Sequence, residues 1–102
     1  MKVRIKVHEA YRKIVAVSDI ELLGKKFIDG NRQIDVDKIF YAGDEMEEGK
    51  ALEIMKMEYA DDSTFSIVGK NSIKLAIKAG IIADKPKAIL TIQGVPYALG
   101  LM

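Results

Sequence analysis

The sequence predicts an α+β protein, a two-layer α/β sandwich in which two main helices cover one face of a mainly antiparallel sheet. Three observations predict this fold. Residues 2–41 contain alternating and β-branched segments separated by turn signals, a pattern typical of strands. Residues 44–79 contain two segments with helical spacing, and a further apolar segment follows at residues 88–93. Strands, then helices, then a strand favour helices placed on one side of a sheet.

The first strands are predicted near the N-terminus. Residues 2–7 alternate cationic and apolar side chains, so they predict a half-buried strand with a cationic outer face. Residues 14–17 predict a second, more buried strand. Asp19 is then expected to cap a short helical turn over residues 20–23, which Gly24 closes.

A hairpin and another strand are predicted next. Asp29-Gly30-Asn31 is a tight-turn signal between residues 27–28 and the alternating residues 33–36. Residues 39–41, Ile-Phe-Tyr, predict a further short strand before Gly43.

Two helices and a final strand complete the prediction. A helix is expected from Asp44 to about Ala60, because acidic side chains gather where the helix dipole is positive. Residues 61–68 fit either a strand or a continuation of this helix. A second helix is predicted over residues 70–79, ended by Gly80. Residues 88–93 predict the last strand, after which Val95 stays extended because a proline follows it.

These periods also predict the core. Alternate strand positions and every third or fourth helix position should be buried. The predicted core residues are Val3, Ile5, Val7, Ile14, Val17, Leu52, Met55, Ile73, Ala76, Leu90 and Ile92.

Length and composition indicate which class of protein this is. The 102 residues fit one domain, residues 1–102, and 49% of them are hydrophobic, as in a folded globular protein. There is no cysteine and His8 is the single histidine, so we expect no transition-metal site and no cofactor. The N-terminus lacks a signal-peptide pattern and no apolar run is long enough to span a bilayer. We therefore expect a cytoplasmic protein without a membrane partner.

Charge is unevenly distributed along the chain. The net charge is only +1, but residues 1–43 carry +3, residues 44–62 carry −6 and residues 63–102 carry +4. A general electrostatic attraction to nucleic acid is therefore excluded, but a basic surface on one part of the protein is not.

A lysine stripe is the clearest candidate for that basic face. Lys70, Lys74 and Lys78 recur every four residues, and no acidic residue lies between Lys70 and Ala83 to pair with them. Lys85 and Lys87 extend the same sign. The stripe is either the solvated face of an amphipathic helix or a surface for phosphate or an acidic protein. Gly69, just before this helix, leads to free N–H groups that could hold one anion.

Several segments resemble a known family. The stretches FYAGDEMEEGKALEIMK, SIVGKNSIKLAIKAGII and IQGVPYALG are similar to the archaeal family called domain of unknown function 424. The similarity extends over nearly the whole chain, from the VRIKV strand to the tail. It implies a small two-layer α/β sandwich in an archaeal cytoplasm. Members are often encoded beside translation and ribosome-export genes, which implies ribonucleoprotein work.

The resemblance also implies a family-motif surface, with three departures from it. The matching positions are Asp19, Phe40, Tyr41, Gly43, Gly69, Gly94 and Pro96. The family usually has cysteine, asparagine and histidine where this chain has Ser18, Ser66 and Tyr97. A family site built on those three types would have lost its softest metal ligands here. Tyr97 is expected to fill the place of the usual histidine, in a packed GVPY turn.

Three functions follow as hypotheses. We expect a non-catalytic binding module, with RNA or a ribonucleoprotein of the translation system as its partner. The alternative is a protein-interaction module that self-associates through the apolar tail, residues 94–102. The third hypothesis is a small-molecule enzyme with its site near the C-terminal GVPY motif. No grouping of serine, histidine and carboxylate can be found in the sequence, so catalysis is the least favoured.

Overall fold

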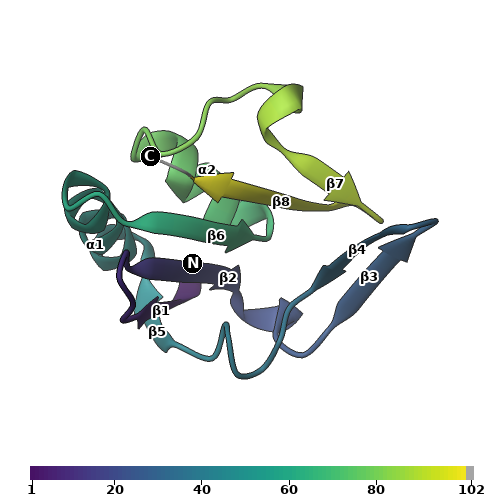
Figure 1. Cartoon of the computed structure of the whole chain (residues 1–102), viewed down its shortest axis with the longest axis horizontal. Coiled ribbons are helices and arrows are strands. Elements are labelled where there is room, and N and C mark those ends of the chain that lie inside the picture. Colours follow the sequence, from purple (N-terminus) through teal and green to yellow (C-terminus); the bar gives the residue numbers. More distant parts are fainter. Residues whose placement is uncertain (101–102) are drawn as a thin grey trace.

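The computed structural model describes residues 1–100 and contains a six-stranded sheet, a separate two-stranded hairpin and two α-helices (Figure 1). The helices are α1 Glu48–Ala60 and α2 Lys70–Lys78, and the two 3-10 turns are η1 Ile20–Leu22 and η2 Pro86–Ala88. The strands are β1 Lys2–His8, β2 Ile14–Asp19, β3 Lys26–Asp29, β4 Arg32–Asp35, β5 Asp44–Glu47, β6 Thr64–Val68, β7 Leu90–Ile92 and β8 Val95–Gly100.

The large sheet has the strand order β5-β1-β2-β6-β8-β7. Only β2 and β6 pair in parallel, and the other neighbours in this sheet are antiparallel. Helix α1 contacts β1 and β5, while α2 contacts β2, β6 and β8 (Figure 1). The α+β prediction, with two helices on one face of a mainly antiparallel sheet, is confirmed.

The main core lies between the helices and the sheet. Strand alternation turns Val3, Val17 and Ile67 toward α1 and α2, and each is fully buried. Of the predicted core residues, seven are buried: Val3, Ile5, Val17, Met55, Ile73, Ala76 and Ile92. Four are only half-buried, because they lie toward the ends of their elements or on the rim of the helix layer: Val7, Ile14, Leu52 and Leu90.

A second, smaller core covers the opposite face of the sheet. The β3–β4 hairpin and residues 36–43 lie across this face and bury Ile34, Val36 and Tyr41 against Ala16 and Val68 of the sheet. Gly30, in the two-residue turn of the hairpin, has a φ of 64°, as tight hairpin turns require. The predicted turn at this position is confirmed.

The predicted start of the first helix is wrong by four residues. Residues 44–47 form β5, which pairs with the edge of β1, and α1 begins only at Glu48. Backbone pairing to β1 therefore outweighs the helix signal of the acidic side chains, as tertiary context often does. The undecided residues 61–68 contain β6 and no continuation of the helix.

The strand predicted at residues 39–41 is absent, and a turn takes its place. The Asp37 carboxylate accepts hydrogen bonds from the backbone N–H groups of Ile39 and Phe40, both at 3.3 Å. An aspartate that bonds to the following backbone in this way favours a turn over a strand.

The C-terminal segment forms a hairpin. Strands β7 and β8 are joined by Gln93 and Gly94, which both have positive φ, 51° and 79°, as a type I′ turn requires. The sequence indicated only β7, and β8 was not predicted. The remaining residues of the predicted self-association segment, Leu101 and Met102, lie outside the described residues.

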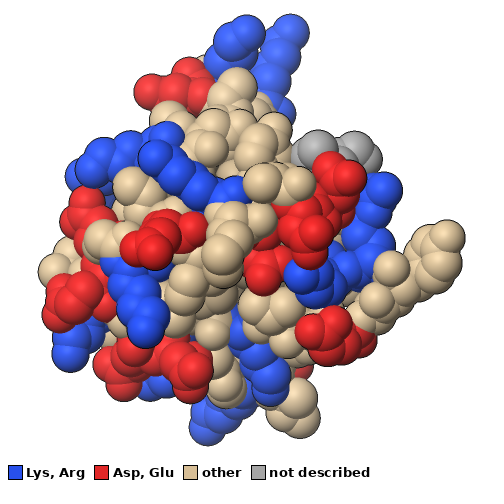
Figure 2. Space-filling model, turned by 90° about the vertical axis from the view of Figure 1, so that its left-hand side faces the viewer, with Lys and Arg blue, Asp and Glu red and all other residues tan. Residues whose placement is uncertain are grey.

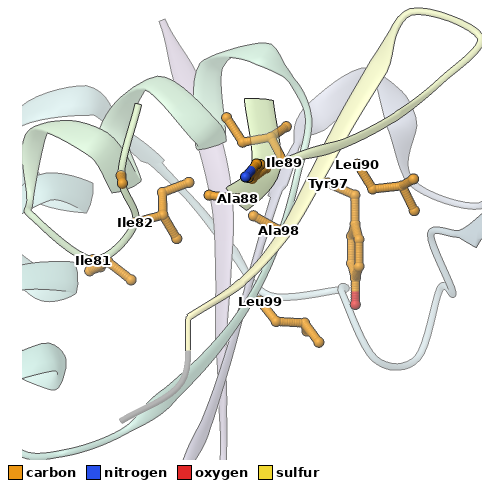
Figure 3. A pocket seen from close by; sticks show the side chains of 10 residues that line it. Ile81, Ile82, Ala88, Ile89, Leu90, Tyr97, Ala98 and Leu99 are labelled. Atoms are coloured by element: carbon orange, nitrogen blue, oxygen red, sulfur yellow. The ribbon is translucent and has the colours of Figure 1, made fainter. Parts of the chain in front are cut away.

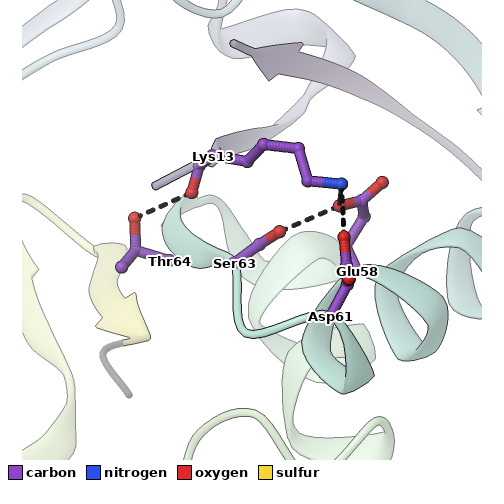
Figure 4. A network of polar contacts seen from close by, with 5 residues as sticks. All are labelled: Lys13, Glu58, Asp61, Ser63 and Thr64. Atoms are coloured by element: carbon purple, nitrogen blue, oxygen red, sulfur yellow. Dashed lines mark hydrogen bonds and ion pairs between the residues drawn. The ribbon is translucent and has the colours of Figure 1, made fainter. Parts of the chain in front are cut away.

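An ion-pair network joins the ends of three elements (Figure 4). The Lys13 ammonium lies 2.7 Å from Asp61 and 3.0 Å from Glu58, which also accepts a hydrogen bond from Ser63. Hydrogen bonds to these two carboxylates raise the pKa of Lys13 above its usual value. Lys13 therefore stays charged and connects the start of β2 to the end of α1.

Candidate functional site

The carboxylate of Asp19 occupies the N-terminus of α2. Its Oδ1 accepts hydrogen bonds from the backbone N–H and the hydroxyl of Ser72, both at 2.8 Å, and its Oδ2 accepts one from the N–H of Asn71 at 3.1 Å. The expectation that Asp19 caps the adjacent turn is wrong, since its side chain makes no cap bond to η1. The sequence predicted that the N–H groups at the start of α2 could hold an anion. The Asp19 carboxylate, from β2, occupies that position.

Gly69 makes this long-range cap sterically possible. It has a φ of 108°, and a Cβ at this position would overlap the Asp19 carboxyl group. Its N–H also donates to the carbonyl of Pro96 at 2.9 Å. Three family-motif positions, Asp19, Gly69 and Pro96, thus join β2, α2 and β8 and have a structural role.

The cationic face of β1 holds the segment that precedes β5. Arg4 donates to the Gly43 carbonyl and Lys6 to the Ile39 carbonyl, each at 3.2 Å. The His8 ring stacks on Phe40, with centroids 4.5 Å apart, and its Nε2 donates to the Phe40 carbonyl at 2.8 Å. The cationic side chains that the alternation placed outside are therefore used within the fold.

Three hydroxyl groups meet on the sheet face opposite the helices. The Tyr41 hydroxyl lies 2.6 Å from Ser66 Oγ, which donates to the Tyr97 hydroxyl at 3.4 Å. Ser66 and Tyr97 are two of the three departures from the family pattern. The third, Ser18, is fully buried, and its Oγ has no partner among the described atoms. Tyr97 therefore takes part in a polar cluster and is not only a packed turn residue.

A cavity of about 560 Å³ opens beside this cluster, and we name it the hydroxyl pocket. The polar side chains that line it are Asp35, Asp37, Tyr41, Thr64, Ser66 and Tyr97, and Phe40 and Leu99 add apolar surface. Sequence reasoning missed both aspartates. Their spacing could have revealed them, since Asp35 and Asp37 alternate with the buried Ile34 and Val36 and so project from the other side of the chain.

Tyr41 should titrate far above neutral pH. Burial raises the pKa of Tyr41 to about 12, while the hydrogen bond with Ser66 opposes this shift. Because the folded-state pKa lies above the unfolded value, the associated stability is present below about pH 10 and is lost as the pH rises through about 12. A ¹³Cζ resonance of Tyr41 that moves only near pH 12 is the expected result. Ionisation near pH 10 would show that the ring is not enclosed.

The lysine stripe lies beside a groove between α2 and the segment that follows it. Lys70, Lys74 and Lys78 border this groove, which has a volume of about 470 Å³ and which we name the lysine groove. Its apolar surface comes from Ile73, Ile77, Ile89 and Pro96. Lys85 and Lys87 do not line it, and Lys87 borders a different cavity.

The stripe has no acidic partner within α2, but Lys78 has one on the other helix. Lys78 lies 3.2 Å from Glu48 of α1, and Asp84 also lines the lysine groove. In the described part of the chain, no ion pair involves Lys70, Lys74, Lys85 or Lys87. The face in Figure 2 mixes basic and acidic side chains, with no large area of basic residues alone.

A second apolar cavity, of about 630 Å³, adjoins β8. Figure 3 shows Ile82, Ala88 and Ile89 beside the strand, with Tyr97 directed away from them. Strand β7 pairs only with residues 95–97 of β8, and Leu99 beyond that pairing is 52% exposed. The described part of the tail is therefore a sheet strand with one large apolar side chain in water.

Two observations on residues 1–100 concern metal ions and membranes. No group of three or more His, Asp or Glu side chains there lies close enough together to hold a metal ion. Neither described helix has the length and apolar character needed to cross a bilayer.

Comparisons with known proteins give a family match and a similar structure. The model of a family described as protein of unknown function (DUF424) matches residues 7–101. An uncharacterized conserved protein from Methanopyrus kandleri has a similar crystal structure, with a TM-score of 0.81 and 22% sequence identity. The superposition covers 97% of this chain and 90% of that chain. No curated protein matches the sequence.

Proposed function

Since this chain belongs to the family of unknown function DUF424, whose description names no activity, we propose a function from its surface. The protein is a non-catalytic binding module. Its lysine groove takes an acidic segment of a partner protein that inserts apolar side chains between the lysines.

One observation carries this proposal: unpaired positive charge and apolar surface meet in the same groove. Lys70 and Lys74 are exposed and make no ion pair within residues 1–100, while Ile77 and Ile89 beside them are half-buried. An acidic amphipathic segment satisfies both features, because its carboxylates reach the lysines and its apolar side chains cover the isoleucines. Asp84 and Glu48 border the same region and limit the net positive charge.

RNA or a ribonucleoprotein of the translation system remains the alternative partner. Lysine ammonium groups bind phosphate without reading bases, so Lys70, Lys74, Lys85 and Lys87 also suit a nucleic-acid backbone. Two features count against it. Among the described residues that line the lysine groove none is aromatic, so a base has nothing to stack on. An apolar surface also contributes little to phosphate binding.

Self-association is a second candidate, favoured by the exposed Leu99. A side chain that is 52% exposed beside an apolar cavity and a partly unpaired strand edge suits a second copy of the chain. Sedimentation at increasing concentration tests it: a mass that doubles, and that Leu99→Ser returns to monomer, would place the interface here.

Catalysis has less support from the geometry. His8 uses its Nε2 to donate to the Phe40 carbonyl, so this nitrogen cannot accept a proton from a nucleophile. Tyr41, whose pKa burial raises to about 12, is protonated at neutral pH like an ordinary tyrosine and is not activated as a base. A small-molecule enzyme with its site near the GVPY motif is therefore the least favoured proposal.

Charge reversal of the lysine groove should weaken the binding of an acidic peptide. The probe is a fluorescein-labelled amphipathic peptide of alternating glutamate and leucine pairs, followed by fluorescence anisotropy. Lys70→Glu with Lys74→Glu should weaken its binding about tenfold or more, since two attractions become repulsions. Raising the salt concentration should weaken binding to the unchanged protein.

Matched variants separate the explanations. Lys25→Glu with Lys26→Glu makes the same charge change at exposed lysines outside the groove and should leave binding unchanged. Ile77→Ser should weaken binding of the peptide but not binding of a single-stranded RNA probe. Equal losses in the groove and control variants would contradict the proposal. A different outcome is that only the RNA binds, and that each lost lysine reduces the slope of log affinity against log salt concentration by about one unit. The groove would then be a phosphate-binding site.

A further inference from the structure

We propose that the hydroxyl pocket is a binding site for an organic cation, a ligand that carries an ammonium or guanidinium group. The pocket lies on the sheet face opposite α1 and α2, so this inference is independent of the lysine groove.

The charge of the pocket has one sign. Asp35 and Asp37 are the charged residues that line it, and no Lys, Arg or His is among its lining residues. Neither carboxylate takes part in an ion pair within residues 1–100. Asp37 is held in place because its two oxygens accept the N–H groups of Ile39 and Phe40. Two carboxylates at one mouth favour a cation over an anion or a neutral ligand.

The hydroxyl cluster supplies further acceptors. Each hydroxyl has one proton. Either Tyr41 or Ser66 can donate in their 2.6 Å contact, and Ser66 Oγ lies 3.4 Å from the Tyr97 hydroxyl. The Tyr97 oxygen accepts at most this one bond within the cluster, so a lone pair on it is available at the pocket. The N–H groups of an ammonium or a guanidinium can bond to the Tyr97 oxygen while the aspartates neutralise their charge.

Aromatic side chains make the pocket suitable for an organic cation and less suitable for a metal ion. Phe40 and Tyr41 meet edge to face, with ring centroids 4.9 Å apart, and Tyr97 forms a third aromatic wall. Such rings pack against alkyl chains, and their faces attract cations that are weakly hydrated. The volume of about 560 Å³ admits a group of the size of a lysine or arginine side chain.

The same chemistry has two sources, a free polyamine and a basic side chain of a partner protein. Both present an alkyl chain that ends in a cationic nitrogen group. The experiment therefore uses one probe for each source.

The test is a titration of the full chain followed by ¹H–¹⁵N correlation spectra, with agmatine as the free probe. The amides of Tyr41 and Ser66 and those next to Asp35 should shift. Replacing Asp35 by Asn should weaken binding roughly threefold to fivefold, as expected for an exposed charge pair. Tyr97→Phe should weaken it as well, whereas Glu53→Gln, an exposed carboxylate on α1, should change nothing.

The second probes are Nα-acetyl-lysine methylamide and Nα-acetyl-arginine methylamide. If they bind as tightly as agmatine or more tightly, the source is a protein side chain; if only agmatine binds, the source is a small molecule. The proposal is overturned if agmatine shifts no amide around the pocket, if 1-pentanol shifts the same amides equally, or if Glu53→Gln weakens binding as much as Asp35→Asn. Because both aspartates lie outside the lysine groove, none of these results bears on the peptide-binding proposal.

Discussion

Replacing Asp19 by alanine should lower the free energy of unfolding by roughly 3 kcal/mol, the range expected when an N-cap and charged hydrogen bonds are lost together. Asp19 is only 3% exposed, and three donors of α2 bond to its carboxylate. Without it, the N–H groups of Asn71 and Ser72 and the hydroxyl of Ser72 lose their partners in a site that water reaches poorly. The variant would also disconnect the start of α2 from β2.

Urea denaturation followed by circular dichroism measures this loss. Asp19→Asn keeps one acceptor oxygen and should cost less than the alanine variant. Asp44→Ala, which removes an exposed acid from β5, serves as the control and should stay within about 0.5 kcal/mol. An unfolding midpoint of Asp19→Ala equal to that of the control would show that the long-range cap does not stabilise the fold.

Truncation of Ile73 to alanine should cost roughly 2–5 kcal/mol. Ile73 is 5% exposed and packs in the main core between α2 and the sheet. The loss combines the transfer free energy of the removed methyl and methylene groups with that of the cavity they leave. Differential scanning calorimetry can compare it with Ile39→Ala, whose side chain is 76% exposed. Similar melting temperatures for the two variants would place Ile73 at the surface and contradict the orientation of α2.

The sequence predicts those parts of the fold that depend on local periodicity. Alternation identified the inward face of β1, through Val3 and Ile5, and helical spacing identified the buried side of α2, through Ile73 and Ala76. Prediction from periodicity failed where a contact with residues far away in the sequence decides the local structure. Residues 44–47 have the sequence pattern of a helix start, but they form a strand because they pair with the edge of β1.

The candidate sites show the same division. The alignment of Lys70, Lys74 and Lys78 on one face follows from their spacing, but the Lys78–Glu48 ion pair joins residues of two different helices. Asp19 was expected to bond to its neighbours, yet it bonds to Ser72 across the parallel β2–β6 pairing. No local pattern contains such a contact.

The hydroxyl pocket was beyond prediction for a further reason. Tyr41, Ser66 and Tyr97 come from a turn and two strands, and only the sheet register places them together. The resemblance to the family did mark all three positions, although the family usually has asparagine and histidine where this chain has Ser66 and Tyr97. Their convergence gives those marked positions a common location and a hydrogen-bonded arrangement.

Methyl NMR can show whether the lysine groove receives an acidic segment with apolar anchors. Protein labelled at its isoleucine δ1 methyl groups would be titrated with the glutamate–leucine peptide. We expect shifts at Ile77 and Ile89, which line the groove, and none at the exposed Ile28 and Ile39. Shifts confined to Ile81 and Ile82 near β8, or no methyl shift at saturating peptide, would contradict this proposal.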